Sequence, residues 1–151
     1  KLVLAGKKIL NGNAEVLNDL EKYILTNNLS TSILMTDYLS NREISSLFKK
    51  ALIYVFPSVE EGFGIPILEA FAMKTPVVTS NAGAMVEIAE GAAEHFNAGD
   101  HIELFKTLTK LIISKPERTY LIQKGSERLM AFSREKFIKD YEELILKSVN
   151  N

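Results

Sequence analysis

The chain has 151 residues, of which 46% are hydrophobic and 25% are charged, and its formal net charge is −1. A near-neutral chain lacks the broad basic surface that nucleic-acid backbones require, so we expect no nucleic-acid partner. Cysteine is absent, which excludes disulfide and thiolate–metal scaffolds and fits a reducing, cytoplasmic setting. No apolar run approaches the ~20 residues of a membrane-spanning helix, and the length is typical of one domain.

The apolar pattern of the first hundred residues predicts an alternation of short strands and helices. We expect strands at residues 2–5, 32–35, 52–56, 76–79 and 94–96, and helices at residues 14–26, 41–50, 65–73 and 85–89. Ser40 and Glu43 have the spacing of a capping box before the second helix. This rhythm predicts an α/β fold with a Rossmann-like parallel sheet flanked by helices, and ligands of such sheets bind at the carboxyl ends of the strands.

The remainder of the chain is predicted to be a helical tail. Asp100 and Glu103 are expected to cap a first helix, Pro116 to open a second, and Ser133 to precede a third. The apolar residues expected on the buried face of the first tail helix are Ile102, Phe105, Leu108 and Ile112. The last helix carries an apolar stripe, which favours docking on a core over a membrane surface. We expect part of it to be exposed, because the domain to which this tail would cross is missing; the stripe consists of Phe137, Tyr141, Leu144 and Ile145.

The most informative segment is PSVEEGFGIPILEA at residues 57–70, where Glu61 and Glu69 stand on either side of a glycine turn. Gly62 and Gly64 allow close approach of the backbone to a ligand, and Pro66 suits the first turn of a helix that begins near residue 65. The free N–H groups at that helix start attract a phosphate, and a carboxylate one turn further in can accept hydrogen bonds from vicinal hydroxyls. The residues alone also fit an ordinary strand-to-helix turn with two solvated carboxylates.

The longer segment PSVEEGFGIPILEAFAMKTPVV resembles the signature of the retaining glycosyltransferases of family 4 (glycosyl transferase group 1), which have the GT-B fold and a Glu, seven residues, Glu motif. The similarity continues in LVLAG, YLSNREISSLFKKALIYVFPS, TSNAGAMVEIAEGAAEHFNAGD and FSREKF. The resemblance implies the C-terminal, nucleotide-sugar-binding half of such an enzyme. We therefore expect residues 1–151 to form a single donor-binding domain, an excerpt of a longer two-domain chain, with the first strand–helix unit of that half missing.

The resemblance implies a role for each matching residue of the motif. Glu61 would be the catalytic-site carboxylate that contacts hydroxyls of the transferred sugar, and Glu69 would bind the ribose hydroxyls of the nucleotide. The backbone donors for the diphosphate would come from the turn and the helix start, at Gly62, Phe63, Gly64 and Ile65.

Two further loops are assigned by the same resemblance. The loop at residues 80–87, with Gly83, would lie beside the diphosphate and the transferred sugar, although Val86 stands where many members have proline. Tyr38 and Leu39, after the second strand, would hold the base through backbone groups, with Asp37 in place of a common glycine. The Arg and Lys that grip the diphosphate in the family belong to the missing unit, and Lys7 and Lys8 are interpreted as solvated lysines.

The implied reaction is transfer of a hexose from a GDP- or UDP-sugar to a hydroxyl acceptor with retention of configuration, and mannose is one candidate sugar. The nucleotide sugar is a substrate, and no cofactor or metal is expected, since His95 and His101 have no ligand cluster around them. The saccharide or lipid-linked acceptor would bind through a missing N-terminal domain, which could also provide peripheral membrane association.

A second hypothesis is a noncatalytic α/β nucleotide-binding or receiver-like signalling module that uses Asp37 at a strand end. A receiver needs an acidic cluster after its first strand, whereas this chain has Ala5-Gly6-Lys7-Lys8 there. A dehydrogenase is disfavoured because no G-x-G-x-x-G follows the first strand.

Overall fold

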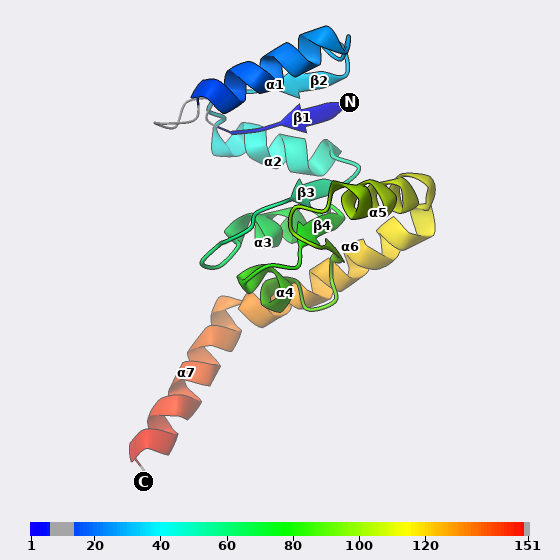
Figure 1. The fold of residues 1–151 in the computed structure, drawn as a ribbon. Helices are drawn as coiled ribbons and strands as arrows, with labels where there is room; N and C mark the ends of the chain where they lie inside the picture. The colour runs from blue at the N-terminus through cyan, green and yellow to red at the C-terminus, as the bar shows by residue number, and fades with distance from the viewer. Residues whose placement is uncertain (7–13, 150–151) are drawn as a thin grey trace. The chain divides into compact units, whose positions relative to one another are not determined.

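A computed structural model describes residues 1–6 and 14–149, which form two compact units, residues 1–44 and 45–151 (Figure 1). The boundary falls within helix α2 (Asn41–Lys50). Lys7 and Lys8 lie outside the described residues, so their predicted solvated state stays a prediction.

The first unit contains one strand–helix–strand motif. Strands β1 (Leu2–Leu4) and β2 (Ile33–Met35) are parallel and in register from Leu2 opposite Ile33, and helix α1 (Ala14–Thr26) connects them. Beyond β2, Ser40 caps α2: its hydroxyl accepts from the N–H of Glu43 at 3.4 Å, and Glu43 Oε2 accepts from the N–H of Ser40 at 2.8 Å. The hydrogen bonds from Ser40 lower the pKa of Glu43, and the predicted capping box is confirmed.

The second unit contains a three-stranded parallel sheet in the order β3-β4-β5. Its strands are β3 (Tyr54–Phe56), β4 (Val77–Ser80) and β5 (Glu94–Phe96), connected by helices α3 (Ile65–Ala72) and α4 (Ala84–Ala89). The predicted elements are therefore present with shifts of one or two residues. The strands of the described residues pair as two parallel sheets, one in each unit, and parallel strands flanked by helices confirm the α/β prediction.

The core of the second unit lies between the sheet and two tail helices, α5 (His101–Ile113) and α6 (Lys115–Leu129). Val78 and Phe96 from the sheet meet Leu111 of α5 and Leu121 of α6, all almost completely buried. Full burial of one such side chain stabilises a fold by roughly 1.5–3 kcal/mol. This packing fixes the sheet against α5 and α6, and with it the carboxyl edge from which the loops leave.

The predicted buried face of α5 is wrong for three of its four residues. Leu104, Leu108 and Leu111 face the core, whereas Ile102, Phe105 and Ile112 are 54%, 69% and 56% exposed. Helix α5 has apolar residues on more than one face, so the spacing of these residues is compatible with burial of either face. Contact with Phe96 and Leu121 favours the leucine face, and sequence periodicity alone does not report that contact.

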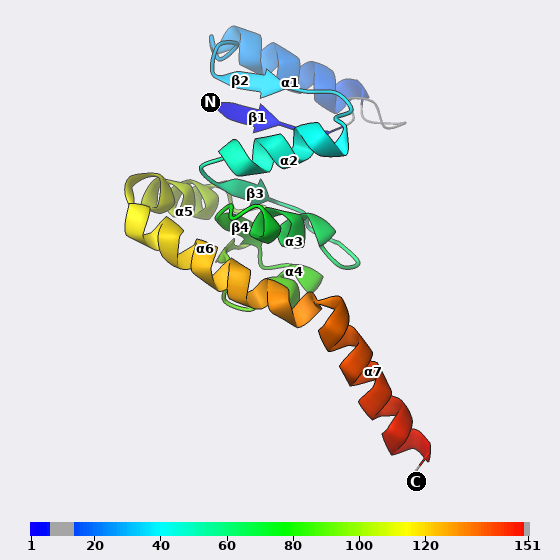
Figure 2. The same ribbon diagram turned by 180° about the vertical axis from the view of Figure 1, so that it is seen from behind.

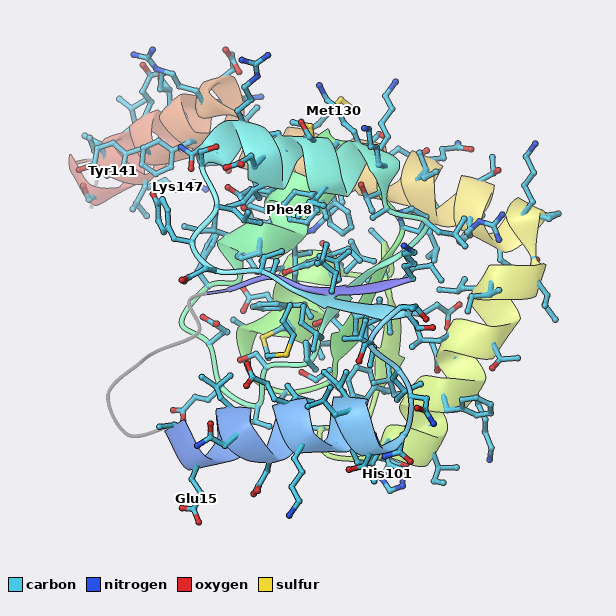
Figure 3. All side chains as sticks on the ribbon, turned by 90° about the horizontal axis from the view of Figure 1, so that it is seen from above. Glu15, Phe48, His101, Met130, Tyr141 and Lys147 are labelled. Atoms are coloured by element: carbon cyan, nitrogen blue, oxygen red, sulfur yellow. The ribbon has the colours of Figure 1, made fainter. Side chains whose placement is uncertain are left out.

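Helix α6 runs beside α3 and continues through a short 3₁₀ turn, η1 (Met130–Phe132), into α7 (Arg134–Val149) (Figure 2). The apolar residues of α7 that were expected to dock remain exposed, at 68% for Phe137 and 56% for Tyr141, which is labelled in Figure 3. Exposure of part of the stripe was expected where its covering domain lies outside these residues. Within the described residues these side chains do not dock on the core of the second unit, so their docking stays a prediction. None of the helices described is both long and apolar enough to cross a membrane.

Candidate functional site

The glycine turn between β3 and α3 has the backbone geometry that a close ligand contact needs (Figure 1). Gly64 is the residue before α3 and is left-handed, with φ 88° and ψ 38°, a conformation that favours glycine. No side chain caps α3, and no hydrogen bond between described residues engages the N–H groups of Gly62, Phe63 or Gly64. The turn therefore presents unpaired donors at the positive end of a helix dipole.

Two hydroxyl groups of β4 hold the segment that leads into this turn. Thr79 Oγ1 donates to the carbonyl of Phe56 at 3.1 Å, and Ser80 Oγ donates to the carbonyl of Ser58. Both side chains are completely buried, so these bonds are shielded from water and constrain the backbone next to the turn. Ser80 was expected only as the first residue of the loop at residues 80–87, and Thr79 had no expected role, because serine and threonine at the end of a strand carry no signal for these hydrogen bonds.

The loop after β4 meets the glycine turn. Gly83 precedes α4 with φ 53° and ψ −135°, and a Cβ placed on it would lie 3.8 Å from the carbonyl oxygen of Glu61. The structure thus brings Gly83 and Glu61 together, as the order of parallel strands predicts. Both loops leave the same carboxyl edge, and only a glycine adopts this conformation at residue 83 without strain.

The pKa of Tyr54 is affected by the charges of the two carboxylates, Glu61 and Glu69. Burial raises the pKa of the Tyr54 phenol strongly, and the negative charges of Glu69 and Glu61 raise it further. Both glutamates are exposed, so their charges are accessible to a ligand. The Tyr54 ring is fixed edge-on against Phe48, with centroids 4.8 Å apart, and it stacks on Phe56; Phe48 is labelled below α2 in Figure 3.

A polar network joins the ends of β4 and β5. Asn81 Nδ2 donates to Asn97 Oδ1 at 2.6 Å, and Asn97 donates from both its backbone and its side chain to Glu103 Oε2 of α5, at 2.6 and 2.7 Å. The network fixes the two loops that follow the second and third strands of the sheet. Asn81 and Asn97 are short polar residues that the sequence does not distinguish from ordinary loop residues, whereas Glu103 was expected to help cap α5 and accepts from Asn97.

Phe63 of the glycine turn contacts η1, the short turn between α6 and α7. The ring of Phe63 meets the ring of Phe132 edge-on with centroids 6.0 Å apart, and the guanidinium of Arg128 lies 4.7 Å from the Phe132 centroid. An open groove beside this contact is lined by Phe63 and Leu68 together with residues of η1 and α7. Phe132 belongs to the FSREKF segment, so this segment and the glycine motif are in contact in the structure.

Tyr38 and Leu39 belong to the other unit, after β2. The side chain of Asp37 accepts from the N–H of Tyr38 at 2.8 Å, and Tyr38 is 80% exposed. Across residues 1–6 and 14–149, no three histidine or acidic side chains gather closely enough to hold a metal ion.

Residues 1–128 match the family described as Glycosyl transferases group 1. One curated relative is the O-antigen chain mannosyltransferase RfbU of Salmonella typhimurium, 32% identical over 92 residues, which are 61% of this chain and 26% of that protein. The chain thus spans about a quarter of the length of this relative. A match over most of the chain to this family favours the glycosyltransferase hypothesis over the receiver-like one.

Solved structures have the same fold. The C-terminal domain of a glycosyl transferase group 1 family protein (LpcC) from Francisella tularensis superposes with a TM-score of 0.72 at 26% identity, covering 81% of this chain and 64% of that one. Anabaena Alr3699/HepE in complex with UDP-glucose superposes with a TM-score of 0.75 at 20% identity, covering 99% of this chain and 40% of that one. The architecture is that of the C-terminal half of a GT-B enzyme, and the chain belongs to the glycosyl transferases group 1 family.

Proposed function

We propose that residues 1–151 are the donor-binding domain of a retaining, family 4 glycosyltransferase, which transfers a hexose from a nucleoside diphosphate sugar to a saccharide or glycolipid in glycan biosynthesis. The observation that carries the proposal is the glycine turn before α3: its N–H groups are unpaired among the described residues, Gly83 approaches it at the carbonyl of Glu61, and the exposed Glu61 and Glu69 flank it in the chain. The chain belongs to the glycosyl transferases group 1 family, and N–H donors beside carboxylates suit the diphosphate and the hydroxyl groups of a sugar donor.

The N–H groups of Gly62, Phe63 and Gly64, with the start of α3 at Ile65, would bind the diphosphate. Negative charge grows on the leaving phosphate as the bond to the sugar breaks, so donors fixed in advance stabilise the transition state more than the ground state. Gly83 would leave room for the diphosphate and sugar beside Glu61. A leaving phosphate that assists deprotonation of the acceptor would remove the need for a separate base.

The two carboxylates would have separate roles. Glu61, next to the turn and to Gly83, would accept hydrogen bonds from hydroxyls of the transferred sugar. Glu69, in the second turn of α3, would accept from the two ribose hydroxyls, and Tyr38 and Leu39 would hold the base. A carboxylate can accept from two vicinal hydroxyls at once, which suits both a hexose and a ribose.

The donor has two candidate bases, guanine and uracil, and the relatives suggest two candidate sugars. The Salmonella relative is named as a mannosyltransferase, which favours a mannose donor, whereas the Anabaena structure contains UDP-glucose. We propose a GDP- or UDP-hexose, with mannose as the first sugar to test.

The acceptor would bind to a domain outside these residues, so the isolated chain would bind donor but barely catalyse transfer. We place the enzyme in the cytoplasm, at the membrane surface where the acceptor is lipid-linked.

The test is a titration of the isotope-labelled chain with UDP, GDP and ADP, followed by two-dimensional NMR. We expect backbone amides from Gly62 to Glu69 to shift with one nucleotide, and Glu69→Ala to weaken that binding. Glu60→Ala is the matched control, because this neighbouring carboxylate is exposed and is not one of the charges that raise the Tyr54 pKa. Shifts that avoid the turn, or equal loss in both variants, would contradict the proposed site.

A further inference from the structure

Arg128, near the end of α6, fastens the C-terminal end of α4. Its Nε donates to the carbonyl of Ile88 at 3.0 Å and its Nη2 to the carbonyl of Glu87 at 2.8 Å, and Nη1 forms an ion pair with Glu90. The arginine side chain is only 20% exposed. A planar guanidinium that satisfies two helix-end carbonyls and a carboxylate fixes the orientation of that helix end.

The same guanidinium also supports the glycine turn. It lies over the ring of Phe132, and Phe132 meets Phe63 edge-on at an interplanar angle of 86°. Arg128 of α6 therefore contacts α4, the helix that follows Gly83. Through the ring of Phe132 it is also connected to the turn that contains Gly62 and Gly64. Arg128 and Phe132, which make the connection, are not among the residues that the family resemblance assigns to the ligand.

We propose that Arg128 is a positioning residue that couples the two walls of the donor site, the glycine turn and the Gly83–α4 segment. The inference rests on the proposed function, and the ligand concerned is a nucleoside diphosphate. Binding of a diphosphate to the turn fixes Phe63 against Phe132, which in turn favours the arrangement of Arg128 that holds α4. The coupling is reciprocal, so loosening α4 weakens binding at the turn.

The chain contains a matched control on the same helix. Arg118 donates to the carbonyls of Leu111 and Ile112 at the C-terminal end of α5, which is the same helix-end contact. That end is far from the site, because α5 begins after β5 and its 13 residues extend about 20 Å away from the carboxyl edge. Arg118→Met therefore removes an arginine's hydrogen bonds to two helix-end carbonyls without touching either wall.

The experiment compares Arg128→Met, Arg118→Met and Arg128→Lys in the labelled chain. The nucleotides are UDP and GDP, and amide shifts are recorded before and during titration. We expect Arg128→Met to lower nucleotide affinity by about three- to tenfold and, without ligand, to shift the amides of both Gly62–Gly64 and Gly83–Met85. Arg118→Met should leave affinity and both sets of amides unchanged. Arg128→Lys keeps the charge but loses the paired bonds and should have intermediate affinity.

A second variant tests the coupling even if Arg128→Met does not fold. Phe132→Leu breaks the ring contact but leaves the hydrogen bonds from Arg128 to α4, and we expect it to shift the turn amides and to be non-additive with Arg128→Met. The coupling is overturned if Arg128→Met shifts only the α4 amides, or if affinity falls equally in Arg118→Met. If the unmodified chain binds neither nucleotide, the proposed function fails, while the ligand-free amide shifts still decide whether Arg128 connects the two walls.

Discussion

A Cβ built on Gly125 of α6 would lie 2.6 Å from Cδ1 of Phe71 of α3 and 3.1 Å from Cγ. Both residues are buried, and Phe71 is only 2% exposed. The close approach of α6 to α3 therefore depends on the absence of a side chain at position 125.

We predict that Gly125→Ala destabilises the second unit. In an exposed helix this change would stabilise by up to about 1 kcal/mol, but here the added methyl displaces a buried ring, and overpacking costs about 1–3 kcal/mol. Urea unfolding measures the difference. Phe71→Leu removes the ring, so Gly125→Ala in that background should cost less than it does alone. A stabilised Gly125→Ala variant would contradict the packing described.

The two glycines of the turn should differ in their tolerance of alanine. Gly64 has φ 88°, and a Cβ there would lie 3.4 Å from Ile67 Cδ1, whereas no atom lies within 4 Å of a Cβ at Gly62. We predict that Gly64→Ala costs about 1–2 kcal/mol of unfolding free energy because of its left-handed backbone, and that Gly62→Ala costs little. Thermal unfolding of both variants checks this, and equal losses would be inconsistent with the turn geometry.

The acidity of Tyr54 should depend on Glu69. Glu69→Gln removes a negative charge that raises the pKa of Tyr54, so we predict that the pKa falls toward its usual value but stays above it, because burial is the larger cause. NMR titration of the labelled tyrosine ring measures the pKa, with Glu60→Gln as the control that leaves it unchanged.

The same group gives a prediction for alkaline pH. A raised folded-state pKa means that the folded chain keeps a proton that the unfolded chain releases above about pH 10. The stabilising contribution of Tyr54 is complete below that pH and is lost as the pH rises toward the folded-state pKa. Tyr54→Phe should therefore flatten this part of the stability profile, and an unchanged profile would argue against a buried phenol.

The two faces of α5 should respond differently to truncation. Leu111 is completely buried and Phe105 is 69% exposed. We predict that Leu111→Ala costs about 2–5 kcal/mol through the cavity that it leaves, and that Phe105→Ala changes stability by less than about 0.5 kcal/mol. Denaturant midpoints measure both. A large loss at Phe105 would indicate that this face is covered in solution.

The sequence predicted the α/β fold and the location of the glycine turn because both depend on local signals. Alternating apolar runs mark the strands and helices, and Gly64 followed by Pro66 marks the start of α3 within one residue. The meeting of Gly83 with Glu61 follows from strand order, since consecutive parallel strands place their following loops at one edge.

Other features depend on contacts between distant segments and were not predictable in the same way. The apolar residues of α5 fit two faces, and only the packing of Leu111 against Phe96 distinguishes them. The support of the turn by Phe132 joins residues that are far apart in the chain. The roles of Glu61, Glu69, Tyr38 and Leu39 toward a ligand stay predictions that the nucleotide titrations address.

The hydrogen bonds that Arg128 and Arg118 donate to the ends of α4 and α5 go to main-chain carbonyls, and only the ion pair of Arg128 with Glu90 depends on a side chain of α4's end. Every amino acid supplies that carbonyl, so the residue that contributes it can change over generations without losing the bond. Replacement of Glu87 or Ile88 by another residue thus leaves the acceptors of Arg128 in place, whereas replacement of the arginine removes all of its bonds to α4 at once.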